Sequence, residues 1–88
     1  MATKKQIETA WNNATKVKGK NPKTWRKDPY GNLIRKGSYG TNGKFGWEVD
    51  HIKPKSKGGS DASKNIQALN TKVNRSLGKK YPKKSRNK

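Results

Sequence analysis

The chain of 88 residues is long enough for one small domain and too short for two independent hydrophobic cores. Its 23 Lys and Arg residues against 5 Asp and Glu residues give a net charge of +18, which favours a polyanionic partner, either nucleic acid or an anionic membrane surface. The absence of cysteine excludes disulfides and thiolate metal sites, and no apolar run is long enough to span a membrane.

Few residues are available for a core, since only 26% of the chain is hydrophobic. Composition alone would predict disorder. Three Trp and three Tyr residues partly offset this shortage, because each large ring can bury about 150 to 250 Å². We therefore expect a thin core that depends on the aromatic rings and an N-terminal helix, and to which a bound metal adds stability.

The segment 3–17 predicts an amphipathic helix. Thr3 and Gln6 have the spacing of a capping box, and Gly19 suits the helix end. We interpret this segment as a helix that docks onto the core with its Lys residues solvated. A membrane-surface helix or a transit peptide shares the basic pattern, but Glu8 and the lack of Arg disfavour both. The apolar residues of the helix recur at intervals of three and four, at Ile7, Ala10, Trp11, Ala14 and Val17.

Two short extended segments follow, at 25–27 and 32–34. Asp28, Pro29 and Gly31 between them form a strong turn signal, so the sequence predicts a hairpin. The next stretch is polar and has no regular period, and it predicts a loop or a flexible flap. Its glycines are Gly37, Gly40, Gly43 and Gly46.

The segment 47–52 predicts a strand, because Trp47 and Val49 alternate with acidic residues and Pro54 stops the pattern. A second short strand is predicted at 66–69, after a long loop at 55–64. Thr71 is the expected N-cap of a short helix that runs to Leu77 and ends at Gly78. Residues 79–88 form a basic tail with little to bury.

The first of these strands concentrates the chemistry of the chain. Of 5 acidic residues and 1 histidine, Glu48, Asp50 and His51 lie within four positions. A lone histidine beside an acid is more often a surface or packing residue, so the pair needs corroboration. A longer pattern supplies it, formed by Asp50, His51, Ile52, Pro54, Ser56, Gly58, Gly59, Asn65, Gln67, Leu69 and Asn74.

Taken together, these residues resemble the HNH endonuclease family, whose ββα-metal motif has this order and spacing, with 14 positions from His51 to Asn65 and 9 from Asn65 to Asn74. The resemblance covers about 47–78, with a looser likeness at 25–46 to small, phage-type members. It implies an α+β fold: a ββα-metal (HNH, or His-Me finger) motif with an N-terminal helix and a small upstream hairpin. We expect a single HNH nuclease domain over 1–78, followed by the basic tail at 79–88.

The resemblance also implies roles for individual residues. Asp50 and Asn74 are expected to hold one divalent metal ion, and Asn74 in the third motif position marks an HNN variant. This oxygen-rich donor set suits Mg²⁺ or Mn²⁺, while Zn²⁺ and Ni²⁺ stay open because family members accept them. Asn65 is expected to hold the histidine in place by hydrogen bonds across the long loop. Glu48 is either an auxiliary ligand on the strand face of Asp50 or a surface acid.

His51 is the expected general base, because histidine is the side chain that normally exchanges a proton near neutral pH and the chain has no other. Phosphate contacts are expected from Arg75, beside Asn74, and from Lys53 and Lys55 just after the histidine. Arg26 is a further candidate. Its neighbour Trp25, and Tyr39, either stack on nucleotides or fill the core.

The sequence thus predicts a metal-dependent endonuclease that hydrolyses DNA phosphodiester bonds, with RNA open as a substrate. The alternatives are a non-catalytic basic nucleic-acid-binding protein, which explains the charge but not the motif, and a degenerate HNH domain kept for binding. We expect no membrane partner and a monomer or weak homodimer. No secretory signal is apparent, so we expect action in the cytoplasm of the cell or phage-infected host.

Overall fold

The computed structural model describes residues 2–77, so Gly78 and the predicted basic tail at 79–88 lie outside the described residues. Three short 3₁₀ turns accompany the regular elements, η1 (Lys36–Ser38), η2 (Lys55–Lys57) and η3 (Ser63–Asn65). No helix within this range has the length and hydropathy needed to cross a membrane. The helices and strands are α1 (Lys4–Asn13), β1 (Thr15–Lys16), β2 (Trp25–Lys27), β3 (Leu33–Arg35), β4 (Trp47–His51), β5 (Ile66–Asn70) and α2 (Thr71–Leu77).

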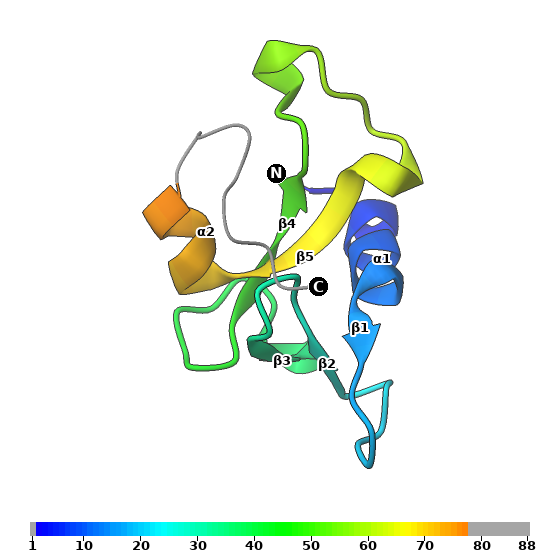
Figure 1. The fold of residues 1–88 in the computed structure, drawn as a ribbon, viewed down its shortest axis with the longest axis vertical. Coiled ribbons are helices and arrows are strands. Elements are labelled where there is room, and N and C mark those ends of the chain that lie inside the picture. Colours follow the sequence, from blue (N-terminus) through cyan, green and yellow to red (C-terminus); the bar gives the residue numbers. More distant parts are fainter. Residues whose placement is uncertain (1, 78–88) are drawn as a thin grey trace.

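The strands form two antiparallel sheets. One has the order β1-β2-β3, and the other pairs β4 with β5. Because α2 follows β5 directly, β4, β5 and α2 make a ββα unit, and in Figure 1 the two helices flank this pair of strands. The predicted α+β architecture is confirmed, with the N-terminal helix, the hairpin and the two later strands in the expected order.

Helix α1 starts where the sequence predicts and ends earlier. The capping box is present: Thr3 Oγ1 accepts a hydrogen bond from Gln6 N at 3.1 Å, and Gln6 Oε1 accepts one from Thr3 N at 3.0 Å. The helix stops at Asn13, and the extension to Val17 was wrong. The side chain of Asn13 donates to the carbonyl of Ile66 instead, while β1 pairs with β2. A tertiary contact therefore overrides the apolar periodicity.

A buried carboxylate shapes the turn of the β2–β3 hairpin. Asp28 is 3% exposed; its Oδ1 accepts from the backbone N–H groups of Tyr30 and Asn32, and Gly31 between them has φ 84°. Its Oδ2 accepts from the backbone N–H of Asn70 at 3.0 Å. One side chain thus shapes the predicted turn and ties the hairpin to the end of β5.

The core is small and aromatic, as the composition predicts. Trp11 and Trp47 are almost fully buried, with ring centroids 5.3 Å apart, and Tyr39 meets the Trp47 ring edge-on. Trp25 lies outside this buried cluster and packs edge-on against Phe45. The core therefore forms where α1 covers β4 and β5. Its buried members are Ala10, Trp11, Ile34, Trp47, Ile66 and Ala68.

Helix α2 occupies the predicted residues, but its N-cap differs. Asn70 Oδ1 accepts hydrogen bonds from the backbone N–H groups of Lys72 and Val73, so Asn70 caps the helix. The assignment of Thr71 as the cap was wrong, because Thr71 is fully buried at the first helical position. Its hydroxyl has no hydrogen-bond partner among the described residues.

Candidate active site

Strand β4 presents the candidate site residues on its two faces. In register with β5, Glu48 lies opposite Leu69, Asp50 opposite Gln67 and His51 opposite Ile66. Trp47 and Val49 pack against the core under α1, so the alternating residues Glu48 and Asp50 project toward α2. His51 ends the strand, where its ring reaches the edge that β5 does not cover.

A cavity of about 650 Å³ lies along this edge. Within the described residues, β4 pairs fully with β5, and its other edge carries only the isolated bridge from Trp47 to Tyr39. The cavity is therefore accessible to side chains from both faces of the strand. It brings together the start of α1, the edge of β4, the following loop and α2. Its lining includes Gln6, Tyr39, Glu48, His51, Lys55, Asp61 and Asn74.

On the α1 side of the cavity, His51 belongs to a polar cluster around Asp61. Its Nε2 lies 2.8 Å from Asp61 Oδ1, while Lys55 Nζ donates to Asp61 Oδ2 at 2.8 Å and Gln6 Nε2 donates to Oδ1 at 3.2 Å. The hydrogen bond from Lys55 and then that from His51 lower the pKa of the Asp61 carboxyl below its usual value. The carboxylate is thus held ionised beside the histidine.

Asp61 is not among the site residues predicted from the sequence. Two signals were available: it is one of only 5 acidic residues, and it lies on the loop between the single histidine and Asn65. Neither signal fixes a contact, because the loop conformation decides which loop residue meets the ring. The structure supplies that conformation.

On the α2 side of the cavity, Asn74 is oriented by an acid. Asn74 Nδ2 donates to Glu48 Oε1 at 3.0 Å, and Arg75 approaches Glu48 Oε2 at 3.4 Å. Since its amide nitrogen faces Glu48, the amide oxygen of Asn74 is the atom directed elsewhere. Glu48 therefore contacts a predicted metal ligand.

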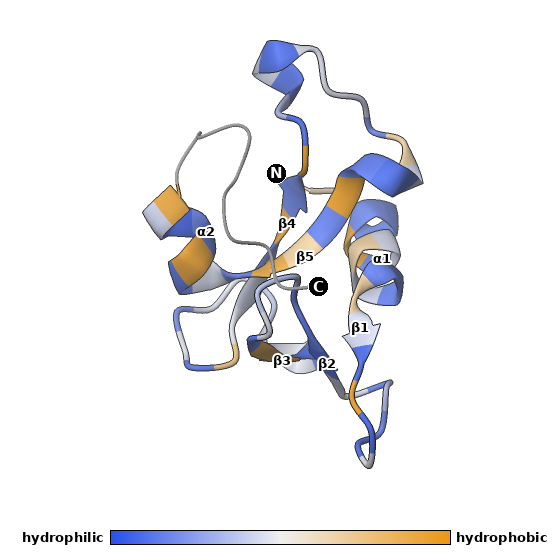
Figure 2. Ribbon diagram, viewed as in Figure 1, coloured by the Kyte–Doolittle hydropathy of each residue, from blue (hydrophilic) through white to orange (hydrophobic). Residues whose placement is uncertain are grey.

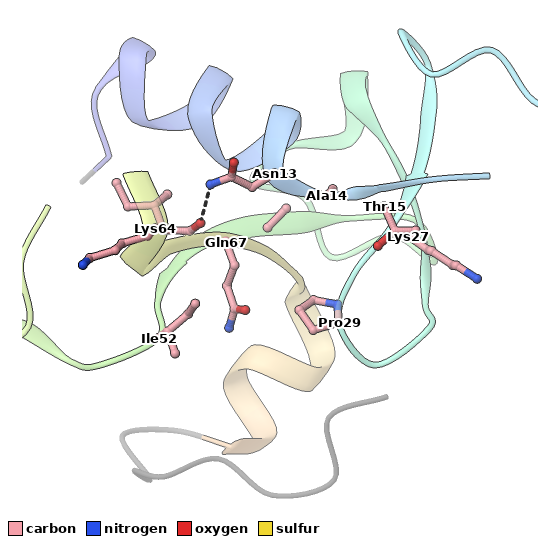
Figure 3. A pocket seen from close by; sticks show the side chains of 10 residues that line it. Asn13, Ala14, Thr15, Lys27, Pro29, Ile52, Lys64 and Gln67 are labelled. Atoms are coloured by element: carbon pink, nitrogen blue, oxygen red, sulfur yellow. Dashed lines mark hydrogen bonds between the residues drawn. The ribbon is translucent and has the colours of Figure 1, made fainter. Parts of the chain in front are cut away.

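Asp50 lies on the same strand face but makes a different contact. Its Oδ2 accepts a hydrogen bond from Gln67 Nε2 at 2.8 Å, and Asp50 does not line the large cavity. Gln67 lines a second cavity of about 380 Å³, where Figure 3 shows its side chain pointing away from Asn13, toward Ile52 and Pro29. The structure thus joins His51, Glu48 and Asn74 at one cavity, with Asp50 held beside it by its cross-strand partner.

Asn65 closes the long loop after the histidine. Its Oδ1 accepts from Lys53 N at 2.8 Å, its Nδ2 donates to the carbonyls of Lys53 and Ser60, and its carbonyl accepts from Ile52 N. Gly59 fits this closure, because a Cβ there would collide with the Lys53 carbonyl. These bonds fix the backbone one and two residues after His51, while the role of Asn65 in positioning the histidine stays a prediction.

Three of the predicted phosphate contacts lie exposed near the cavity. Lys53 and Lys55 follow β4 in a loop that Figure 2 shows as hydrophilic, and the side chains of Lys55 and Arg75 are about 60% exposed. Lys55 and Arg75 also make ion pairs, with Asp61 and Glu48. Basic side chains thus lie on both flanks of the candidate site.

Arg26 does not belong to this surface, so its assignment as a phosphate contact is corrected. It is 9% exposed, and its guanidinium donates to the carbonyls of Trp11, Asn12, Ala14 and Pro22 at 3.0 to 3.3 Å. These acceptors include the last carbonyls of α1, which lack partners within the helix. Arg26 therefore serves as a buried C-terminal cap.

We predict that Arg26→Ala lowers the free energy of unfolding by about 2 to 3 kcal/mol, because it leaves several helix carbonyls without a donor. Urea denaturation measures this value. Arg35→Ala removes the same charge from an exposed position and should change stability by about 0.5 kcal/mol at most. A phosphate-binding Arg26 would instead leave stability unchanged and reduce the salt dependence of DNA binding by about one phosphate contact.

The side chains beside the cavity have the donor chemistry of a hard divalent cation. Asp50, Glu48 and Asn74 offer only oxygen ligands and project from β4 and α2 toward the same side. Within residues 2–77, no three His, Asp or Glu side chains gather closely enough to hold a metal by themselves. A metal here would thus require the Asn74 amide together with water or substrate oxygens, which fits a catalytic rather than a structural site.

Comparison with known families agrees with this geometry. Residues 40–80 match the family model described as HNH endonuclease. The match includes β4, the loop closed by Asn65, β5 and α2. This segment is therefore similar to HNH endonucleases, and the similarity suggests nuclease activity at the level of the family. Neither the curated proteins nor the solved structures contain a match.

Proposed function

We propose that this protein is a metal-dependent endonuclease that hydrolyses DNA phosphodiester bonds, with His51 as the general base. The observation that carries the proposal is the meeting of His51 and Asn74 at one cavity along the uncovered edge of β4. A scissile phosphate placed there lies between a proton acceptor and an oxygen-rich cation site. The HNH family match supports the same reaction class.

In this proposal His51 takes a proton from a water molecule as its oxygen attacks phosphorus. The bond from phosphorus to the leaving sugar oxygen breaks, and that oxygen gains a proton, so one water is consumed for each bond cleaved. Two features support this role: the position of the ring at the end of β4 and the loop that Asn65 closes. Its side chain is 22% exposed, so water can reach it.

Asp50 and Asn74 are the proposed ligands of one divalent cation, with Mg²⁺ or Mn²⁺ preferred by their oxygen chemistry. When bound, the cation stabilises negative charge on the phosphoryl and leaving oxygens. Glu48 holds the Asn74 amide by its nitrogen, so that the oxygen is the available ligand atom. Gln67 similarly orients the Asp50 carboxylate.

DNA is the proposed substrate because the chain has a net charge of +18 and exposed cations on both sides of the cavity. Lys53, Lys55 and Arg75 would contact phosphates without reading sequence. The single domain over 1–78, the monomeric or weakly dimeric state, the cytoplasmic location and the phage-type origin stay predictions from the sequence.

The test is nicking of supercoiled plasmid by the purified protein with Mg²⁺ or Mn²⁺. We expect EDTA to abolish nicking and excess metal to restore it. Asn74→Ala should weaken metal binding, measured by calorimetry, by at least the 10- to 100-fold typical of residues that only support a ligand. Asn12→Ala, an exposed amide on α1, is the matched control and should behave like the parent protein.

Salt-sensitive DNA binding without cleavage under any of these metals would contradict the proposal. That result would favour the non-catalytic nucleic-acid-binding protein. Binding that ignores EDTA would point the same way, because a basic surface needs no metal to contact phosphates.

A further inference from the structure

The cluster around Asp61 determines which nitrogen of the neutral His51 ring carries the hydrogen. An ionised carboxylate can only accept hydrogen bonds. Asp61 receives three: from Lys55 at one oxygen, and from Gln6 and His51 at the other. The atom of His51 in contact with Asp61 is Nε2, so this nitrogen must carry a hydrogen.

In a neutral imidazole the two ring nitrogens have opposite roles, one donating and one accepting. When Nε2 carries the hydrogen, Nδ1 holds the lone pair. Lys55 and Gln6 hold the carboxylate from other directions, so Asp61 keeps its position independently of the histidine. The arrangement therefore selects one tautomer and one ring orientation.

We propose that Asp61 is a positioning residue that fixes His51 in the Nε2–H tautomer and so makes Nδ1 the atom that accepts the proton from water. This inference rests on the proposed function for its catalytic meaning, but the ring state itself does not. After Nδ1 takes the proton, both nitrogens carry hydrogens, and the Asp61 carboxylate beside Nε2 stabilises the resulting imidazolium. Asp61 acts through His51 and needs no contact with substrate.

The first test is a measurement of the ring itself. Since His51 is the only histidine of the chain, nitrogen NMR of uniformly labelled protein reports its two ring nitrogens without overlap. At a pH where the ring is neutral, we expect the parent protein to show hydrogen on Nε2 and an unprotonated Nδ1. Asp61→Ala should raise the Nδ1–H population. The matched control Glu8→Ala removes another exposed acid that pairs with a lysine, and should leave the ring unchanged.

The second test separates positioning from a general structural effect. In single-turnover nicking at saturating protein, Asp61→Ala should lower the rate by about 10- to 100-fold, the range seen when a supporting partner is lost. In a His51→Ala background the same substitution should change the residual rate by less than about two-fold, because no ring remains to be positioned. Glu8→Ala should leave the rate unchanged in both backgrounds.

The results that would overturn the role of Asp61 differ from the result that would overturn the proposed function. An equal loss of rate with and without His51 would overturn the proposal, as would a loss confined to DNA affinity. Unchanged tautomer populations in Asp61→Ala would also overturn it. If the parent protein cleaves nothing, the proposed function fails, while the NMR comparison still decides whether Asp61 sets the ring state.

Discussion

His51→Ala is expected to lower the rate of plasmid nicking by about 10² to 10⁴, the range for loss of a positioned general base. DNA affinity should stay close to that of the parent protein, because the cationic side chains Lys53 and Arg75 are untouched. The fold should also persist, since the His51 side chain is part-exposed and outside the buried core. Single-turnover nicking, fluorescence anisotropy with labelled duplex and thermal denaturation measure the three quantities.

His51→Gln is the companion variant, since it keeps a polar side chain of similar size but provides no basic nitrogen. We expect it to be as inactive as the alanine variant, which separates proton transfer from simple occupancy of the cavity. Full activity in either variant would remove His51 from the mechanism. A parallel loss of DNA affinity would assign the residue to binding.

The second large effect concerns Trp47, which starts β4 and lies at the centre of the core. Its side chain is fully buried, contacts Trp11 and Tyr39, and donates from Nε1 to the Arg35 carbonyl at 2.9 Å. Trp47→Ala should lower the free energy of unfolding by about 3 to 5 kcal/mol. Small domains have about 5 to 15 kcal/mol in total, so we expect a largely unfolded protein at 37 °C.

Urea denaturation followed by circular dichroism measures this loss. Trp25→Ala is the matched control, because Trp25 is only half-buried and packs on Phe45 outside the buried cluster. It should cost clearly less. Equal losses for the two variants would show that the core does not centre on the contact between α1 and β4.

Local patterns were sufficient to predict much of this fold. The alternation around Val49 predicts β4, and the Thr3–Gln6 spacing predicts the start of α1, because each depends on neighbours within a few positions. The end of α1 could not be predicted in this way. It depends on Arg26, whose guanidinium arrives from 12 to 15 positions away to bind the final carbonyls.

The same distinction between local patterns and long-range contacts applies to the candidate site. The family resemblance indicates His51, Asn65 and Asn74, and the structure places the first and last at one cavity. Asp61 could not be found from spacing, since its contact with the ring depends on the conformation of an irregular loop. Arg26 was misassigned because composition shows that an arginine is present but not whether its charge is buried.

The contact of α1 with β4 and β5 limits how the segment that matches the family model can be moved into another protein. The family match begins at residue 40, yet the helix that covers Trp47, Ile66 and Ala68 lies more than twenty-five positions upstream of it. Grafted alone, residues 40–80 would expose an apolar sheet face and lose the Gln6 contact to Asp61. The matched segment is thus not sufficient for a stable fold by itself, and a folded chimera would have to include the helix or a substitute for it.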